Sequence, residues 1–151
     1  MNTKLEIQIM NILLVTAHPL EDSLCSALSF YATEKLQSLG HNVVTENLYA
    51  NNFDPVLTES ERKAYYQNIY DQSNVQDETT RLKNADALVM IFPTWWFNFP
   101  AILKGWFDRV WVPTVAYEHA TNYGPIKPIL NNLEKTLVIT TLGAPWWVDY
   151  C

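Results

Sequence analysis

Ala87-Leu-Val-Met-Ile91 is an unbroken apolar run, and the chain continues from it as Phe92-Pro-Thr-Trp-Trp-Phe-Asn-Phe-Pro-Ala-Ile-Leu-Lys-Gly-Trp-Phe-Asp-Arg-Val110. The run predicts a strand that is buried on both faces, as in a parallel sheet. From Pro100 onward, apolar residues recur every four positions, which predicts a helix with a broad apolar face. Between them, the aromatic residues 95–97 stand beyond the carboxyl end of the strand, where open α/β sheets bind ligands. Three adjacent aromatics at this place favour a planar cofactor.

Strands and helices alternate along the rest of the chain. Apolar runs predict buried strands over Met10–Ala17 and Lys135–Thr141, and His41–Asn47, with Val43 and Val44, predicts a further strand. Helical spacing and capping residues predict helices from Asp22 or Ser23 to Gly40, over Glu59–Tyr70 and over Glu78–Asn84. No repeat or internal linker interrupts this order. We therefore expect a single α/β domain over residues 1–151, with a doubly wound parallel sheet and helices on both faces.

The composition is that of an ordinary globular protein. The 151 residues are 48% hydrophobic with a net charge of -6, which argues against non-specific nucleic-acid binding. The apolar run Ile7–Thr16 is one strand long and has no basic leader or cleavage site, so we expect neither secretion nor membrane insertion. Cys25 and Cys151 have no metal-ligand spacing and predict neither a metal site nor a disulfide. We expect a cytoplasmic protein.

Parallel strands bring three unusual segments to one rim of the predicted sheet. The first, residues 16–28, leads from a strand directly into a helix, and its backbone N–H groups suit a phosphate. His18, Ser23 and Ser26 add donors, although Asp22 and Ser23 could simply cap the helix. Neither a Walker loop nor a Gly-x-Gly-x-x-Gly fingerprint occurs, which disfavours nucleoside triphosphates and a Rossmann dinucleotide site.

The second and third segments also have structural explanations. The aromatics of residues 95–97 could anchor a core or a subunit interface, and those of residues 106–111 lie on a helical stripe typical of packing. Arg109 in that helix is expected in a surface or interface ion pair. In the third segment, Thr140, Thr141 and Gly143 offer hydroxyls and a permissive backbone, or form a plain turn.

Taken together, the three segments resemble the flavodoxin-like NAD(P)H:quinone oxidoreductases, which include DT-diaphorase-type and bacterial drug-modulator-type enzymes. The resemblance spans nearly the whole chain, and Phe92-Pro93 with Pro100–Val110 is its most specific part. It implies a flavodoxin-like fold and thirteen flavin-binding positions. These are His18, Ser23, Leu24 and Cys25 along the phosphate and ribityl chain, Pro93, Thr94, Trp95, Trp96 and Phe97 at the ring, and Thr140, Thr141, Leu142 and Gly143 at its other edge.

The resemblance also implies a substrate pocket. Ala116-Tyr117-Glu-His119 aligns with a segment that places two aromatic side chains, here Tyr117 and His119, over the substrate, usually from the neighbouring subunit. The chain departs from the family pattern in three ways. Leu24 and Cys25 replace a Phe-Asn pair, and Leu142 stands where the family prefers Gly. The assisting tyrosine and histidine of DT-diaphorase-type members are not both available, since Val148 occupies the tyrosine position.

The chain ends before the last strand and helix of the family pattern. We therefore expect four strands and a natural truncation or shortened form. An unpaired edge strand would then invite aggregation or dimer exchange.

The implied activity is hydride transfer from NADH or NADPH, through bound FAD or FMN, to a quinone or similar aromatic acceptor. The protein is then expected to supply stacking and orientation, with no nucleophile or metal ligand. A homodimer is expected, because Trp106, Phe107, Trp111 and the loop around Tyr117 offer apolar surface. Alternatives are an azo- or nitro-compound reductase, a one-electron flavodoxin carrier, a flavin-binding regulatory subunit of a potassium-efflux system and an inactive truncated remnant.

Overall fold

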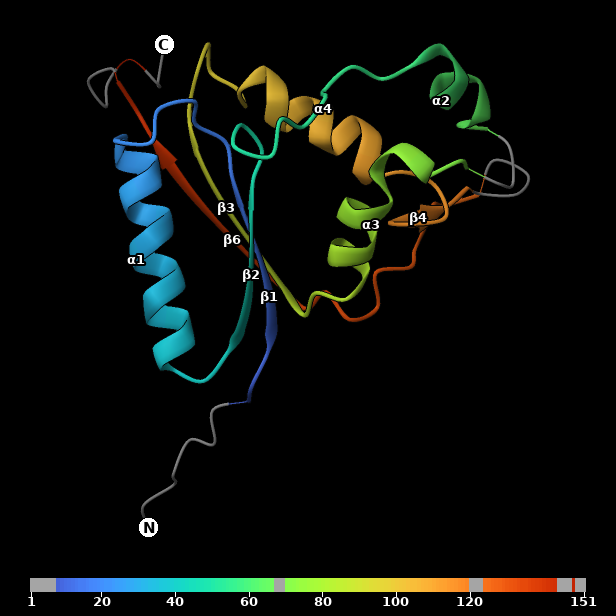
Figure 1. Cartoon of the computed structure of the whole chain (residues 1–151). Helices are drawn as coiled ribbons and strands as arrows, with labels where there is room; N and C mark the ends of the chain where they lie inside the picture. Colours follow the sequence, from blue (N-terminus) through green and yellow to red (C-terminus); the bar gives the residue numbers. More distant parts are fainter. Residues whose placement is uncertain (1–7, 67–69, 120–123, 144–147, 149–151) are drawn as a thin grey trace.

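Four parallel strands form a single sheet in a computed structural model that describes residues 8–66, 70–119, 124–143 and 148. Their order is β2-β1-β3-β6, so the chain crosses over the sheet rather than adding strands in sequence (Figure 1). The strands are β1 (Asn11–Thr16), β2 (Asn42–Asn47), β3 (Ala87–Pro93) and β6 (Lys135–Thr141). The strand register pairs Thr16 with Ile91 and Pro93 with Thr141, which brings three carboxyl ends to one rim as predicted.

Helices cover both faces of the sheet, which confirms the α/β prediction. One face carries α1 (Leu24–Ser38), and the other carries α3 (Gln76–Lys83) and α4 (Ala101–Val110) (Figure 1). Two apolar clusters fill the space on either side, and every residue of β3 is buried between them. The two central strands, β1 and β3, thus have the continuous apolar character of strands covered on both sides, whereas β2 and β6 at the edges are largely exposed. No helix in the described ranges combines the length and apolarity needed to span a bilayer.

Capping side chains define the helix ends. Ser23 accepts a hydrogen bond from the Ser26 N–H at 3.1 Å and is the N-cap of α1. The capping box that the sequence predicts is formed by Thr58 and Glu61 at the start of α2 (Glu59–Ala64). The prediction that this helix continues to Tyr70 is wrong, because it ends at Ala64 and residues 65–66 form a turn. Residues 67–69 and Cys151 lie outside the described residues.

Several smaller elements were not expected from the sequence. A 3-10 turn, η1 (Ser73–Val75), precedes α3, and α3 begins at Gln76 rather than at the predicted Glu78. An antiparallel pair, β4 (Tyr117–Glu118) and β5 (Lys127–Pro128), lies within the stretch predicted to be a loop. Two-residue strands are too short to show an alternating hydrophobic pattern, which explains why the sequence did not reveal them.

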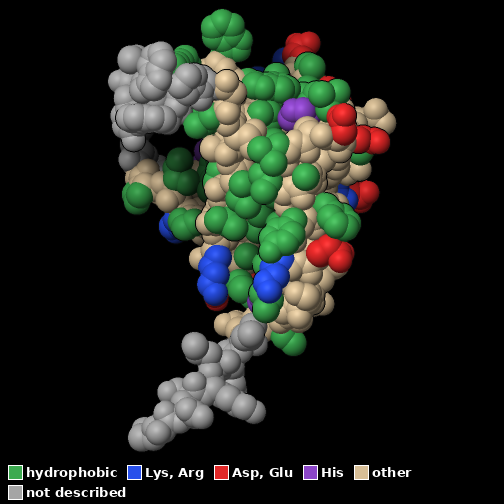
Figure 2. All heavy atoms as spheres, turned by 90° about the vertical axis from the view of Figure 1, so that its left-hand side faces the viewer, with side chains coloured by type: hydrophobic (Ala, Val, Ile, Leu, Met, Phe, Trp, Pro, Cys, Tyr) green, Lys and Arg blue, Asp and Glu red, His purple; other side chains and the backbone are tan. Residues whose placement is uncertain are grey.

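The prediction that residues 135–141 form a buried strand is wrong in one respect. The strand forms, but β6 pairs only with β3 and is the edge of the described sheet. Leu137 and Val138 are 53% and 49% exposed. Phe30 and Tyr31 of α1 are also exposed. Figure 2, which faces the α1 side of Figure 1, shows apolar side chains spread over that side of the molecule.

Two buried carboxylates join the layers of the other face. Glu46 of β2 accepts hydrogen bonds from Trp106 Nε1 and Arg81 Nε, both at 2.8 Å. Burial raises the pKa of Glu46, although Arg81 and Trp106 oppose that shift.

The expectation that Arg109 forms a surface pair is wrong, because Arg109 is buried and its Nη2 lies 2.7 Å from Oε1 of the buried Glu61.

The aromatic stripe of α4 packs inward. Trp106 is fully buried, and Phe107 and Trp111 are partly buried against the same cluster. Trp106, Phe107 and Trp111 therefore leave little apolar surface for the homodimer contact that was predicted from them. The helical spacing correctly predicted packing, and the packing is intramolecular.

Candidate functional site

The three segments at the carboxyl rim of the sheet surround one open pocket of about 680 Å³. All ten residues that line it belong to the thirteen predicted flavin positions. They are His18, Leu24, Cys25, Pro93, Thr94, Trp95, Trp96, Thr141, Leu142 and Gly143. Since these residues are spread over 126 positions of sequence, their common location is produced by the parallel topology of the sheet.

The amino end of α1 forms one wall of this pocket. Within the described ranges, no protein acceptor is found for the backbone N–H groups of Leu24 and Cys25. The first turn of α1 carries no acidic residue, although Glu21 and Asp22 stand just before the Ser23 cap, and the positive end of the helix dipole lies at this wall. His18 Nδ1 accepts the Leu20 N–H at 3.1 Å, so the neutral imidazole carries its proton on Nε2 and can donate. This wall is suited to an anion.

A tight turn with unusual backbone angles forms the second wall. Trp95 and Asn98 exchange both backbone hydrogen bonds at 3.1 Å, and the two residues between them, Trp96 and Phe97, have φ of 51° and 59°. This is a two-residue hairpin of the I′ kind, in which Asn and Gly are preferred because both central residues need positive φ. Trp96 is 94% exposed and Phe97 is 70% exposed. Two aromatics therefore project into solvent from a strained turn.

Hydrogen bonds tie the third segment to the other two. The Thr94 N–H donates to the Thr141 carbonyl at 2.8 Å, and the hydroxyls of Thr94 and Thr140 lie 2.6 Å apart. On the other side, Cys25 Sγ lies 3.4 Å from Thr141 Oγ1. The rim is thus held together by direct polar contacts among the three segments.

Three of the thirteen predicted positions do not line the pocket. Ser23 caps α1, which is the structural alternative that the sequence left open for it. The Thr140 hydroxyl is paired with that of Thr94, and Phe97 occupies the exposed turn. Among the departures from the family pattern, Leu24, Cys25 and Leu142 all line the pocket, and Cys25 is buried.

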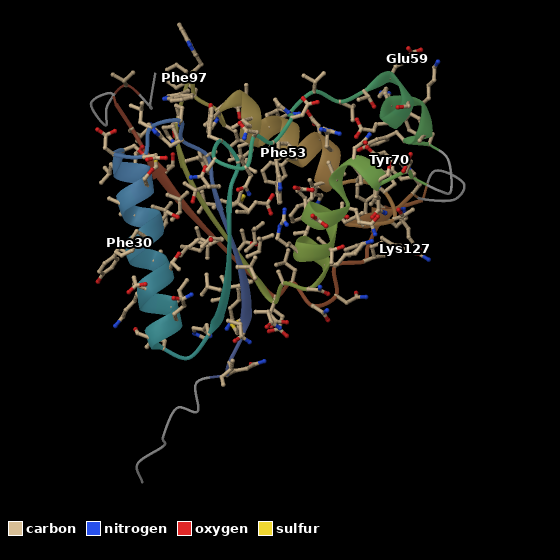
Figure 3. The ribbon with its side chains drawn as sticks, viewed as in Figure 1. Phe30, Phe53, Glu59, Tyr70, Phe97 and Lys127 are labelled. Carbon is tan, nitrogen blue, oxygen red and sulfur yellow. The ribbon has the colours of Figure 1, made fainter. Side chains whose placement is uncertain are left out.

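Tyr117 and His119 lie elsewhere in the same chain. They belong to the region of β4, which lies on the far side of α4 from the turn of residues 95–98 (Figure 1). Figure 3 shows the same separation, with Phe97 on one side of the view and Tyr70 and Lys127 on the other. The structure therefore brings the flavin positions together but does not bring the two predicted substrate residues to them within one chain.

Tyr65 is a neighbour of both substrate residues that the sequence analysis missed. Its hydroxyl lies 2.6 Å from that of Tyr117, and its carbonyl lies 2.7 Å from His119 Nε2. Burial first, and then the hydrogen bond in which the Tyr117 hydroxyl donates to that of Tyr65, raise the pKa of Tyr117. The only sequence signal was a pair of tyrosines after a capping-box helix. Such a pair does not indicate which side chains it will meet.

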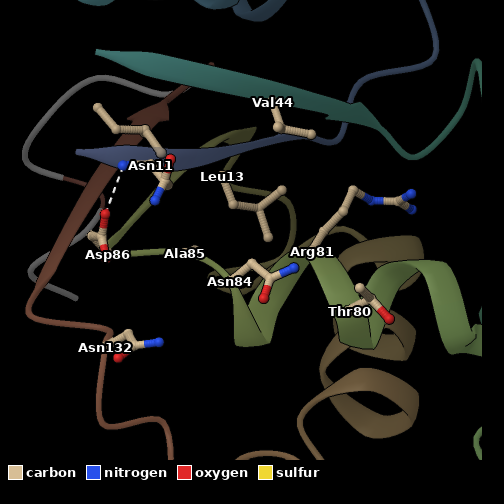
Figure 4. Close-up of a pocket in the computed structure, with 10 residues that line it drawn as sticks. Asn11, Leu13, Val44, Thr80, Arg81, Asn84, Ala85, Asp86 and Asn132 are labelled. Atoms are coloured by element: carbon tan, nitrogen blue, oxygen red, sulfur yellow. Dashed lines mark hydrogen bonds between the residues drawn. The ribbon is translucent and has the colours of Figure 1, made fainter. Parts of the chain in front are cut away.

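A second pocket of about 520 Å³ lies at the opposite, amino edge of the strands (Figure 4). Its charged groups are already paired. Arg81 contacts Glu46 and Glu78 at 2.8 and 2.9 Å, and Asp86 Oδ2 accepts the Asn11 N–H at 2.7 Å. These groups hold the sheet to α3. The open donors and exposed aromatics of the carboxyl rim make that rim the better candidate site.

The sequence was compared with protein families and known structures. A family described as having a flavodoxin-like fold matches residues 10–149. The chain belongs to this family. The flavodoxin-like fold matches what the resemblance implied, and the predicted relation to NAD(P)H:quinone oxidoreductases is confirmed.

Individual relatives support the same placement within the flavodoxin-like family. NAD(P)H dehydrogenase (quinone) 1 of Rattus norvegicus is 36% identical over 150 residues, covering 87% of this chain and 53% of its own. An uncharacterized NAD(P)H oxidoreductase of Haemophilus influenzae is 34% identical over 132 residues, covering 87% of this chain and 64% of its own. The solved NAD(P)H:quinone oxidoreductase from Methanothermobacter marburgensis has a TM-score of 0.81 at 31% identity, covering 93% of this chain and 71% of that one.

The chain spans about half the length of the first curated relatives that it matches, with shares of 53%, 53% and 44%. Solved azoreductase structures from Bacillus anthracis are 19% identical and show the same fold.

Proposed function

We propose that this protein is a flavin-dependent NAD(P)H oxidoreductase that reduces a quinone or a similar aromatic acceptor. The observation that carries the proposal is the single pocket at the carboxyl rim, whose ten lining residues all come from the three predicted segments. The names of the relatives, NAD(P)H dehydrogenase (quinone) and NAD(P)H:quinone oxidoreductase, support the reaction class.

The residues at the rim fit a flavin. Its phosphate would meet the unpaired N–H groups of Leu24 and Cys25, with His18 Nε2 as a further donor. The exposed indole of Trp96 offers a flat apolar surface for a ring system. Hydroxyls of Thr94 and Thr141 supply hydrogen-bonding groups beside it. We propose FAD or FMN as the cofactor, held by all thirteen positions that the sequence indicated, with Ser23, Thr140 and Phe97 supporting the others.

The flavin and the residues of the chain have different roles in this proposal. A bound flavin supplies the chemistry of hydride transfer from NADH or NADPH to the acceptor. The chain's residues bind and orient: the α1 amino end holds negative charge, the turn of residues 95–98 supplies a surface for stacking, and the Thr-rich end of β6 closes the rim. Among the lining residues, none is paired with a base as a nucleophile would be, and this agrees with cofactor-centred chemistry.

We propose that the working form is a homodimer in which Tyr117 and His119 of one subunit face the flavin pocket of the other. Within one chain these two residues lie apart from the pocket, so they can serve it only from a second copy (Figure 1). The exposed turn aromatics Trp96 and Phe97 offer apolar surface for that contact. We place the protein in the cytoplasm, where NADH and NADPH are available and the thiol of Cys25 stays reduced.

The decisive experiment is flavin uptake followed by turnover. Purified protein is mixed with FMN or FAD, freed of unbound flavin and examined by absorbance, and NADH or NADPH oxidation is then followed with a quinone and no other protein. We expect a bound-flavin spectrum and ping-pong kinetics. Loss of the stacked indole in Trp96→Ala should weaken flavin binding about fivefold, on the order of 1 kcal/mol. Phe30→Ala removes an aromatic side chain that is 70% exposed, from α1 and outside the pocket, and should leave flavin binding unchanged.

Several outcomes would contradict the proposal. A protein that takes up neither flavin would agree with the inactive alternative. Bound flavin without NAD(P)H oxidation would instead favour a carrier or a regulatory subunit. An azo- or nitro-compound reductase remains the second candidate, because azoreductases share the fold. Comparing the ratio kcat/KM for a quinone, an azo dye and a nitroaromatic would separate these activities.

A further inference from the structure

Tyr65 makes polar contacts with both of the residues proposed to face the acceptor. Its hydroxyl lies 2.6 Å from the Tyr117 hydroxyl, and its carbonyl oxygen lies 2.7 Å from His119 Nε2. The two contacts use different parts of one residue, the side chain and the backbone. A single position therefore constrains two side chains that lie 52 and 54 residues further along the chain.

Both sides of this contact are anchored. Tyr65 directly follows α2, which is held by the capping box of Thr58 and by the buried pair of Glu61 with Arg109. On the other side, β4 pairs with β5, and the Tyr117 carbonyl accepts the Thr114 N–H at 2.9 Å. The contact thus joins two supported segments, so it can fix side-chain positions.

The contact also determines where His119 holds its proton. A backbone carbonyl only accepts hydrogen bonds, so His119 Nε2 carries a proton and donates it to the Tyr65 carbonyl. The imidazole stacks on Tyr66 with centroids 5.5 Å apart and meets Tyr117 edge-on at 5.6 Å. The Arg62 guanidinium lies over the rings of Tyr65 and Tyr66.

The two phenols present one free donor. In a pair of hydroxyls, one proton is used between the two oxygens and the other remains available. Either phenol can be the donor, so Tyr117 can turn its O–H to a ligand while it accepts the O–H of Tyr65. That remaining O–H suits an acceptor bearing a carbonyl oxygen, as quinones do. A ligand that lacks an oxygen or nitrogen acceptor at that position cannot accept a hydrogen bond from this O–H.

We infer that Tyr65 is a positioning residue for the acceptor, holding Tyr117 and His119 in one arrangement that favours carbonyl-bearing substrates. The inference rests on the proposed function, because Tyr65 acts only through those two residues. Tyr65 itself is not assigned a contact with the substrate.

The test is a double-mutant cycle on the flavin-loaded full chain. Tyr65→Phe and Tyr117→Phe each remove one hydroxyl and keep the ring, and Tyr31→Phe makes the same change on an exposed face of α1. Each of the first two should raise the KM for a quinone about three- to tenfold with kcat within about twofold, as expected for one lost hydrogen bond. The combined variant should be no worse than either single variant, and Tyr31→Phe should match wild type.

A readout independent of turnover accompanies the cycle. With tyrosine labelled by carbon-13 at Cζ, NMR follows the titration of the Tyr117 phenol, whose pKa should fall in Tyr65→Phe because the hydrogen bond is lost, while burial keeps it above its ordinary value. An unchanged quinone KM or additive effects in the cycle, in a wild type that turns over, would overturn the role of Tyr65 alone. A wild type that neither binds flavin nor oxidises NAD(P)H would overturn the proposed function, and the role of Tyr65 with it.

Discussion

Replacing Trp96 with glycine should make the flavin-free protein more stable while weakening flavin binding. Trp96 is the first central residue of the turn between Trp95 and Asn98 and has φ of 51°. A non-glycine residue in this left-handed region is disfavoured by about 1–2 kcal/mol. Packing of the Trp96 side chain offsets little of that conformational cost, because the side chain is 94% exposed. The strain is therefore uncompensated in the protein without a ligand.

The expected size of the effect follows from two opposing terms. Glycine removes about 1–2 kcal/mol of strain but adds about 0.5–1 kcal/mol of backbone entropy to the unfolded chain. The net gain is about 0.5–1 kcal/mol, which corresponds to a rise in Tm of about 1–4 °C in a domain of this size. Trp96→Ala keeps the Cβ and hence the strain, so its Tm should stay near that of wild type.

The assay compares wild type, Trp96→Ala and Trp96→Gly by urea and thermal unfolding without flavin, and then by flavin titration. Both variants should bind flavin about fivefold more weakly, because both lose the indole. Only the glycine variant should gain stability. If the glycine variant is no more stable than the alanine variant, the turn is not strained. The inference that Trp96 lowers the stability of the turn while it contributes to flavin binding would then be refuted.

Three further predictions concern the fold. Gly105→Ala should lower the free energy of unfolding by about 1–3 kcal/mol, measured in urea, because an added Cβ would lie 2.5 Å from the Cα of Pro55; an unchanged midpoint would contradict this close approach. Gly40→Ala meets no atom within 4 Å but has φ of 91°, so it should lower stability by about 1 kcal/mol, and Gly40→Asn should lower it less. Glu61→Gln should destabilise by about 3 kcal/mol at pH 7, because the buried Arg109 loses its close carboxylate partner and keeps only that of Asp54, whose Oδ2 lies 3.9 Å away. Burial opposes the charged form of Glu61, but its hydrogen bonds prevail and lower its pKa below 4.5, so this stability is lost as acid protonates it. The difference in the free energy of unfolding between wild type and Glu61→Gln should therefore narrow as the pH falls through the pKa of Glu61. A difference that does not change with pH would disprove this coupling between protonation and stability.

Local sequence signals predicted most of the elements and most of the pocket. The apolar run of residues 87–91 became the central strand because a strand covered on both faces needs no polar positions. Ten of thirteen flavin positions share one pocket, because a parallel sheet necessarily collects the loops after its strands. Whether these residues bind flavin awaits the spectrum described above.

The errors arose where neighbours in space, rather than in sequence, determine a residue's role. Arg109 looked like a surface charge, and it is buried because Glu61, from a helix 48 residues earlier, reaches it. Residues 135–141 had the pattern of a buried strand, but burial depends on what packs beside a strand, and β6 has one strand partner in the described sheet.

The sequence by itself determined the alternation of strands and helices and the capping of α1 and α2, because these depend on short-range periodicity and local hydrogen bonds. The family followed from the resemblance carried by Phe92-Pro93 and Pro100–Val110. Only the tertiary structure decided that Trp96 and Phe97 sit in a strained turn, since positive φ at those residues requires contacts to hold it. It also decided that Tyr65 meets Tyr117 and His119. Such meetings depend on where two supported segments cross, and no local pattern encodes that point.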